Sequence, residues 1–247
     1  MLKTVLFDFN GVIINDEPIH HELLDEVLIG ENLLPVGSEF SQICLGRSDR
    51  ACLRDILARR GRSATEDYLT ILIDKKKRLY RERIEKLTEL PVYQDTIAFL
   101  KRVRTRELPI GLVTGAARSE VEYILDRTGI REYFSVIVTG DEITGSKPQP
   151  DGYLLAVERF NRWDFNLQLQ PADCLVIEDT FAGCEAAKRA GMQVVGIAHT
   201  YPFHFMQRVS NWAIDNFSQL DLDRIERFFA GSAEVDRERS RPDNPVE

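Results

Sequence analysis

Short runs of β-branched and other apolar residues alternate along this chain with stretches in which apolar residues recur at helical spacing. The first run is apolar up to a carboxylate at position 8, as in a strand that is buried on both faces. Strands that alternate with helices form βαβ units, so the pattern predicts the α/β class with a doubly wound, Rossmann-like parallel sheet. The predicted strands are Thr4–Phe9, Ile110–Val113, Val136–Val138, Leu175–Ile177, Val194–Ile197 and Trp212–Ile214.

The helical patterns fall into two groups. One group lies between predicted strands and ends at glycine or another turn residue, at Thr96–Thr105, Ser119–Thr128, Gly152–Asn161 and Ala182–Ala190. The second group fills the long interval between the first two strands, at His20–Leu28, Asp49–Arg60 and Thr65–Lys86. Because that interval has no strand pattern, we predict an inserted, all-helical cap.

The domain boundaries follow from these patterns. Residues 1–15 and 91–231 are predicted to form the core, and residues 16–90 the cap. Prolines interrupt helix around Asn15–Pro18 and Glu89–Val92, so we expect the hinges of the cap there. Residues 232–247 carry almost no apolar side chains, which predicts a mobile tail.

Composition narrows the class of protein. A chain of 247 residues with 43% hydrophobic residues can bury a large core, and its net charge of −8 argues against nucleic-acid and membrane partners. The cysteines form no Cys-x-x-Cys pair and stand among apolar residues, which favours buried free thiols in a reducing compartment: Cys44, Cys52, Cys174 and Cys184. No apolar run approaches the ~20 residues of a membrane span, and the N-terminus enters a strand at once. We therefore expect a cytoplasmic protein, and make no prediction of its oligomeric state.

Polar residues with chemical potential follow four of the predicted strands. In chain order they are Asp8, Thr114 with Gly115, Lys147, and Glu178 with Asp179. Because ligands bind at the carboxyl edge of an open parallel sheet, we expect these side chains to converge. Asp8, the backbone carbonyl of Asn10 and Asp179 are suitable oxygen ligands for Mg²⁺, with Glu178 close by. The hydroxyl and the lysine are suited to a phosphoryl group.

The same residues stand in four segments that occur in a familiar order: Phe7-Asp8-Phe9-Asn10-Gly11-Val12, Leu112-Val113-Thr114-Gly115, Ser146-Lys147-Pro148-Gln149-Pro150-Asp151 and Val176-Ile177-Glu178-Asp179-Thr180. They resemble the motifs of the haloacid dehalogenase superfamily, in the branch that contains β-phosphoglucomutase-like and phosphoglycolate-phosphatase-like enzymes. The resemblance covers nearly the whole chain except the tail. It implies that Asp8 attacks phosphorus to form an aspartyl-phosphate. It also implies that Thr114 and Lys147 hold the phosphoryl group, and that Glu178 and Asp179 hold Mg²⁺.

The resemblance further implies a helical cap that meets the substrate, a small phosphorylated metabolite. Asp16–His20 resembles the family's entry into the cap, and Leu45–Arg50 resembles its substrate loop. Sugar phosphates, phosphoglycolate and nucleotides stay open as substrates. The candidate substrate-binding residues are His20, Gly46, Arg47, Arg50, one lysine of the 75–77 run taken as Lys76, and Gly115 in the core. A solvated helix face is the simpler interpretation of the lysine run.

Asn10 departs from the family's pattern, in which the residue two after the nucleophile is usually an aspartate. That aspartate protonates the leaving group and later activates water. An amide can do neither, and a positioned acid or base typically contributes ~10²–10⁴-fold to the rate. We therefore expect a Mg²⁺-dependent phosphatase that is slowed or altered by Asn10, with metal and phosphate binding retained.

Three explanations of Asn10 stay open. The enzyme could use another proton carrier, such as His20, or a substrate such as an acyl phosphate, whose leaving group needs little protonation. The chain could instead be a catalytically weak phosphate-binding or regulatory protein. Deamidation of Asn10-Gly11 could also generate the missing aspartate. Mutase activity ranks below hydrolysis because it needs the same proton carrier, and dehalogenation ranks lower still because Lys147 and the acidic pair favour metal-assisted phosphoryl transfer.

Overall fold

The computed structural model describes residues 1–239, and the side chains of residues 1–231. Its centre is a sheet of six parallel strands in the order β3-β2-β1-β4-β5-β6. The strands are β1 (Thr4–Phe7), β2 (Ile110–Val113), β3 (Val136–Val138), β4 (Cys174–Glu178), β5 (Gln193–Ile197) and β6 (Trp212–Ile214). All six predicted strands are present, and the doubly wound α/β class is confirmed.

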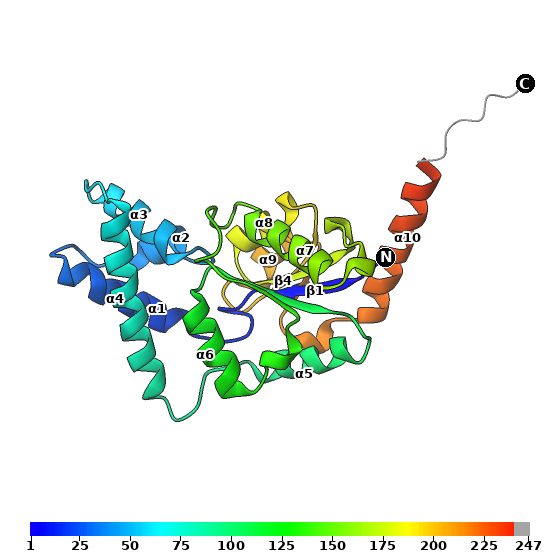
Figure 1. The fold of residues 1–247 in the computed structure, drawn as a ribbon, viewed down its shortest axis with the longest axis horizontal. Coiled ribbons are helices and arrows are strands. Elements are labelled where there is room, and N and C mark those ends of the chain that lie inside the picture. Colours follow the sequence, from blue (N-terminus) through cyan, green and yellow to red (C-terminus); the bar gives the residue numbers. More distant parts are fainter. Residues whose placement is uncertain (240–247) are drawn as a thin grey trace, which may run out of the picture.

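Helices cover both faces of the sheet (Figure 1). Successive β1 residues point to opposite faces, so Val5 and Phe7 pack in one apolar cluster while Leu6 packs in the other. The first cluster is closed by α5 (Gln94–Arg104), α6 (Arg118–Thr128) and α10 (Leu222–Arg239). The second is closed by α7 (Asp151–Trp163), α8 (Phe181–Arg189) and α9 (Phe203–Val209). Short 3₁₀ turns η1 to η5 lie at Gly37–Glu39, Arg131–Tyr133, Phe165–Leu167, Pro171–Asp173 and Phe217–Gln219.

The part of the chain between β1 and α5 is helical, as expected, and stands to one side of the sheet (Figure 1). It contains α1 (Glu17–Gly30), α2 (Phe40–Ile43), α3 (Asp49–Arg59) and α4 (Glu66–Glu85). These helices bury their own apolar cluster, which includes Leu24, Leu53 and Leu72. Ser48 and Thr65 accept hydrogen bonds from the first turns of α3 and α4, which fixes where those helices begin.

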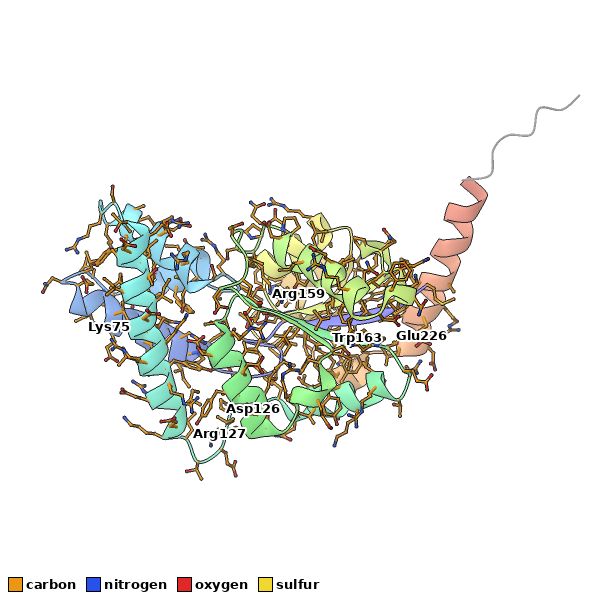
Figure 2. The ribbon with its side chains drawn as sticks, in the orientation of Figure 1. Lys75, Asp126, Arg127, Arg159, Trp163 and Glu226 are labelled. Atoms are coloured by element: carbon orange, nitrogen blue, oxygen red, sulfur yellow. A yellow bond between two sulfur atoms is a disulfide. The ribbon has the colours of Figure 1, made fainter. Side chains whose placement is uncertain are left out.

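The two segments that connect this helical insertion to the core lie side by side. Ile14 forms an antiparallel bridge with Val92, and Tyr93 donates its backbone N–H to Ile13 at 3.0 Å. Just before the second of these segments, Arg127 of α6, labelled in Figure 2, donates to the carbonyls of Ile84 and Leu87, at 3.1 and 3.3 Å. The insertion is therefore hydrogen-bonded to α6 as well as joined to the core by the two segments. The hinges at Asn15–Pro18 and Glu89–Val92, and the domain boundaries, stay predictions.

The helix α10 runs past the point where we predicted a mobile tail. Apolar residues at helical spacing, Leu222, Ile225 and Phe229, anchor its first half in the core. From Ser232 the sequence still contains good helix formers, and the helix continues to Arg239. The rest of that predicted tail, residues 240–247, lies outside the described residues. Nowhere in the described part of the chain is a helix long and apolar enough to span a membrane.

Candidate active site at the carboxyl edge of the sheet

Asp8 and Glu178 meet where the strand order of the sheet reverses. The strands β1 and β4 are neighbours with Phe7 opposite Ile177, and the Asp8 N–H donates to the Ile177 carbonyl at 3.0 Å. Glu178 is the last residue of β4, and both side chains are buried. Open parallel sheets bind ligands at this point, because the loops on either side diverge and leave a crevice.

Lys147 connects the two carboxylates. Its ammonium group donates to Asp8 Oδ1 at 2.7 Å, to Glu178 Oε1 at 2.6 Å and to the Val113 carbonyl at 3.2 Å. Burial alone would lower the pKa of Lys147, but Asp8 and Glu178 reverse the effect and raise it. Burial raises the pKa of Asp8 to about 7, although Lys147 opposes the shift. This lysine is therefore a fixed positive charge beside the candidate nucleophile.

Glu178 is held in position beside Lys147 by several hydrogen bonds. Besides Lys147, Oε1 accepts from the Tyr153 hydroxyl at 2.8 Å. Oε2 accepts from the backbone N–H groups of Asp179 and Thr180, at 3.1 and 3.3 Å. Gly183 of α8 lies against this carboxylate, because a Cβ atom built there would be 1.8 Å from Oε1.

Asp179 is the least satisfied member of the acidic group. Its Oδ2 accepts from the Thr200 hydroxyl, but its buried Oδ1 has no hydrogen-bond partner among the described residues. Burial, reinforced by Glu178 and Asp8, raises the pKa of Asp179 well above its usual range. An unpaired buried carboxylate oxygen is costly, so this atom points to a missing positive partner.

The acidic group fits a divalent cation. Asp8, Glu178 and Asp179 each offer a carboxylate oxygen, and these atoms lie within 4.8 Å of one another. Hard cations such as Mg²⁺ and Ca²⁺ prefer such oxygen ligands. Gly11 makes the approach of Asp179 possible, because it has φ +75° and its missing Cβ would lie 1.8 Å from Asp179 Oδ2.

The Asn10 side chain turns toward the helical insertion. Its Nδ2 atom donates to Asp16 Oδ1 at 2.9 Å and lies 3.2 Å from His20 Nε2. Asp16 is fully buried and also accepts from the Tyr80 hydroxyl at 2.6 Å. The Gly11 N–H, which deamidation of Asn10 would use as the attacking group, instead donates to the Ile14 carbonyl at 2.8 Å. This arrangement opposes deamidation.

His20 connects Asn10 to Lys76 of α4. Lys76 Nζ lies 2.7 Å from His20 Nδ1 and 2.7 Å from Asp49 Oδ1. A contact that short between two nitrogens requires a lone pair on one of them, so the facing atoms share one proton. Burial and Lys76 would lower the pKa of His20, but Asp16 raises it and the net shift is upward. Lys76 is only 2% exposed and differs in this from Lys75 and Lys77.

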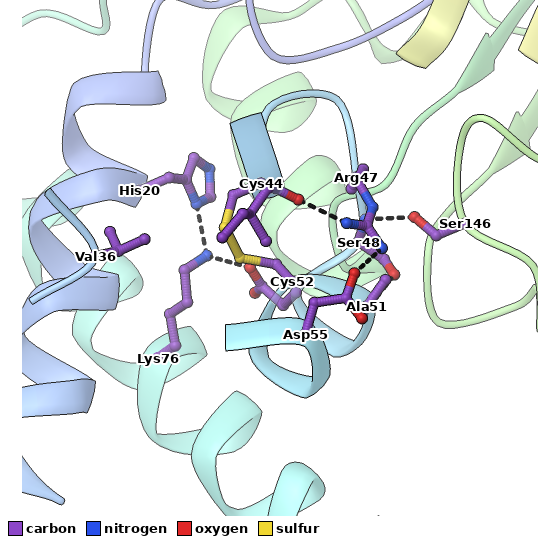
Figure 3. The surroundings of a disulfide bond; sticks show 12 residues. His20, Val36, Cys44, Arg47, Ser48, Ala51, Cys52, Asp55, Lys76 and Ser146 are labelled. Atoms are coloured by element: carbon purple, nitrogen blue, oxygen red, sulfur yellow. Dashed lines mark hydrogen bonds and ion pairs between the residues drawn. A yellow bond between two sulfur atoms is a disulfide. The ribbon is translucent and has the colours of Figure 1, made fainter. Parts of the chain in front are cut away.

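The cap loop, residues 45–50, packs directly on the core. The Ser48 N–H donates to Ser146 Oγ at 2.8 Å (Figure 3), and a Cβ atom on Gly115 would lie 2.9 Å from the Arg47 carbonyl. Gly46, with φ +73°, approaches Thr180 in the same way. The loop therefore sits over the strand ends that carry the acidic group.

A disulfide between Cys44 and Cys52 closes this loop (Figure 3), which corrects the prediction that these cysteines are free. Cys44 follows α2 and Cys52 lies in α3, and the turn between the two helices brings their Cα atoms to 4.9 Å. A spacing of eight residues does not reveal that approach. Cys174 and Cys184 are free and buried, as predicted.

The remaining predicted residues occupy different surroundings. Thr114 is buried at the end of β2, where its hydroxyl accepts from the Ala116 N–H at 3.0 Å. Arg47 binds Asp55 Oδ2 at 2.8 Å. Arg50 binds Glu66 at 2.7 Å and, with Ser48 and Gly115, lines a second cavity of about 110 Å³ between the insertion and the core.

A cavity of about 40 Å³ lies beside Asn10 between the insertion and the core. Sequence reasoning missed several residues that shape it or support its walls, because each could be an ordinary helix or core residue. Asp16 could be a helix cap and Glu120 an exposed helix residue, and no spacing signals otherwise. The polar lining includes Asn10, Glu17, His20, Arg47, Lys76 and Glu120.

The fold and the buried acidic site define a class of α/β hydrolases with an inserted helical segment. A family profile described as haloacid dehalogenase-like hydrolase matches residues 2–191, and the chain belongs to this family. The match confirms the resemblance to the haloacid dehalogenase superfamily that the sequence motifs indicated.

Relatives support the same assignment. A phosphorylated carbohydrates phosphatase from Thermotoga maritima is 28% identical over 201 residues, covering 81% of this chain and 87% of that protein. A β-phosphoglucomutase from Bacillus subtilis is 30% identical over 203 residues, covering 81% and 85%. A crystal structure of β-phosphoglucomutase from Clostridium difficile has the same fold, with a TM-score of 0.79 at 22% identity over 94% of this chain and 99% of that one.

Proposed function

We propose that the protein is a Mg²⁺-dependent phosphatase of a small phosphorylated metabolite, with Asp8 as the nucleophile. The observation that carries this proposal is the buried group of Asp8, Glu178 and Asp179, in which Asp179 Oδ1 has no partner among the described residues. The names of the two curated relatives, a phosphatase of phosphorylated carbohydrates and a phosphoglucomutase, support a phosphoryl-transfer reaction.

In the proposed reaction, a carboxylate oxygen of Asp8 attacks phosphorus and the bond from phosphorus to the substrate oxygen breaks. Lys147, 2.7 Å from Asp8, neutralises charge on the phosphoryl oxygens, and Thr114 lies at the end of the neighbouring strand β2. A divalent cation bound by Asp8, Asp179 and the Asn10 carbonyl, with Glu178 nearby, would withdraw further charge. Water then attacks phosphorus and frees Asp8.

Asn10 limits both steps. The leaving oxygen needs a proton in the first step and the water must lose one in the second, and the amide of Asn10 can do neither. His20 is the titratable group next to it, at 3.2 Å. We expect slow turnover on ordinary monoesters, and faster turnover on substrates whose leaving group needs no proton.

The alternative function is a phosphate-binding or regulatory protein with little turnover. The contact between Asn10 and Asp16 favours it, because that contact uses the Asn10 side chain in a structural hydrogen bond. This alternative predicts measurable binding of a phosphorylated metabolite with hydrolysis at background, even over long incubation.

A panel of phosphorylated metabolites tests both functions, assayed with Mg²⁺ and with a chelator. We expect hydrolysis that requires the metal and falls to background in Asp8→Asn. Asp126→Asn, at an exposed position on α6, is the control for a nonspecific effect of the lost charge. If Asp8→Asn hydrolyses as fast as the natural protein, Asp8 is not the nucleophile.

A further inference from the structure

The cations that line the cavity beside Asn10 are already matched within the protein. Arg47 binds Asp55 at 2.8 Å and donates to the Ile43 carbonyl at 2.8 Å. Lys76 binds Asp49 at 2.7 Å and also contacts His20. A second phosphate or carboxylate on the substrate would therefore meet cations whose charge is already balanced by carboxylates of the protein.

Two residues of the same lining hold atoms without a partner among the described residues. Glu120 is 4% exposed and its Oε1 accepts no hydrogen bond, while Oε2 accepts only from the Ala117 N–H, at 3.4 Å. Arg47 Nε is buried and donates to no acceptor. Because buried polar atoms are nearly always paired, one free acceptor and one free donor call for a ligand group that both donates and accepts. A hydroxyl is such a group.

The free carboxylates of the lining also oppose an anion. Burial raises the pKa of Glu120, and it raises the pKa of Glu17 to about 7. Both side chains therefore take up a proton more readily than an exposed glutamate, so a substrate anion beside them would be repelled or would have to bind together with a proton.

We infer that the non-reacting end of the substrate is an uncharged, hydroxyl-bearing group, and that Glu120 determines this specificity. Hydroxyl groups of the substrate donate to Glu120 Oε1 and accept from Arg47 Nε. The inference rests on the proposed function and narrows it to monophosphates of polyols and sugars. It excludes bisphosphates and phosphorylated carboxylic acids such as phosphoglycolate.

A matched pair of compounds tests the inference. Glucitol 6-phosphate and 6-phosphogluconate have the same chain length and differ at the far end, where one has an alcohol and the other a carboxylate. One hydrogen bond to a charged group supports a difference of about tenfold. We therefore expect kcat/KM for glucitol 6-phosphate to be at least about tenfold higher, and equal or reversed values would overturn the inference.

Glu120→Gln tests the residue itself. Glutamine keeps the size of the side chain and removes its charge, so we expect the ratio between the two compounds to fall to within about threefold, mainly through KM. Glu122→Gln is the matched control on the same helix, because Glu122 binds Arg118 and Arg131 and does not line this cavity. If the ratio of the two kcat/KM values stayed unchanged in Glu120→Gln, Glu120 would not determine the specificity.

Calorimetric binding of both compounds to Asp8→Asn separates this inference from the proposed function. If the natural protein hydrolyses neither compound but Asp8→Asn binds glucitol 6-phosphate about tenfold more tightly, the specificity stands and the phosphatase function fails. If the natural protein hydrolyses both compounds equally well, the function stands and the specificity fails.

Discussion

Asn10 donates a 2.9 Å hydrogen bond to Asp16, a buried carboxylate that also accepts from Tyr80. An aspartate at position 10 would face Asp16 across the same short distance. Two carboxylates so close cannot both be ionised, so one of them would keep a proton at neutral pH. The surroundings of Asn10 are therefore suited to a protonated acid, although the residue present is an amide.

Asn10→Asp is expected to raise kcat by a factor of about a hundred to a thousand, in the lower part of the usual contribution of ~10²–10⁴ for a positioned acid or base. Because the new acid must be protonated to assist the leaving group, kcat should fall as pH rises through its pKa. The natural protein, which has no acid at position 10, should not show this fall of kcat with rising pH. Equal kcat values in both proteins, measured with saturating Mg²⁺, would mean that position 10 takes no part in proton transfer.

Mg²⁺ is expected to raise the melting temperature by several degrees, because it neutralises a buried acidic group. Asp179→Asn should lose most of this response. Without metal, the variant should melt above the natural protein, since it removes a carboxylate oxygen that lacks a partner. Asp126→Asn, an exposed position on α6, is the control. If Mg²⁺ raised the melting temperature equally in Asp179→Asn and Asp126→Asn, Asp179 would not be a ligand of the metal.

Gly11→Ala and Gly61→Ala form a matched pair, since both glycines have positive φ, +75° and +73°. A Cβ atom at Gly61 meets no other atom within 4 Å, but one at Gly11 would lie 1.8 Å from Asp179. Denaturant unfolding should show a loss of about 1 kcal/mol for Gly61→Ala, from backbone strain alone. Gly11→Ala should lose more, and should also lose the Mg²⁺ response. Similar losses with the response intact would contradict the packing of Gly11 on Asp179.

Cys52→Ser should lower the free energy of unfolding by about 2–3 kcal/mol, because the Cys44–Cys52 disulfide closes a short loop. KM should rise as well, since that loop carries Arg47 and Ser48 over the strand ends. A dithiol reductant should reproduce both effects in the natural protein and leave Cys52→Ser unchanged. If the reductant changes neither property of the natural protein, the disulfide has no part in fixing the loop.

The sheet was predictable because its signal is local. Each strand is a short apolar run such as Ile110–Val113, and each following polar residue lies at the carboxyl edge for that reason alone. The convergence of Asp8, Lys147 and Glu178 then follows from the parallel order of the strands. The short helices α2 and α9 span too few turns to show a clear apolar period. The helix α10 went unpredicted although Leu222, Ile225 and Phe229 stand at helical spacing.

The tertiary contacts of the insertion and of the cavity were not predictable. Asp16, Glu120 and Cys52 look like a helix cap, a surface acid and a core thiol when each is taken with its sequence neighbours. In the fold, Asp16 binds Tyr80 of a distant helix, Cys52 meets Cys44 across a turn, and Glu120 lines the cavity beside Asn10. Arg50, which its place in the cap loop assigns to the substrate, also forms an ion pair with Glu66 that no local spacing reveals. Such pairings depend on how the helices pack, which no local pattern encodes.

Trapping a phosphorylated intermediate tests the central claim most directly. The natural protein and Asp8→Asn are mixed with Mg²⁺ and a substrate found in the panel, quenched in acid and digested, and the peptide that contains residue 8 is analysed by mass spectrometry. Because Asn10 cannot activate water, the account predicts a phosphoryl group on Asp8 in the natural protein and none in the variant. Hydrolysis that proceeds at the same rate in Asp8→Asn, or without any phosphoryl group on that peptide, would contradict it.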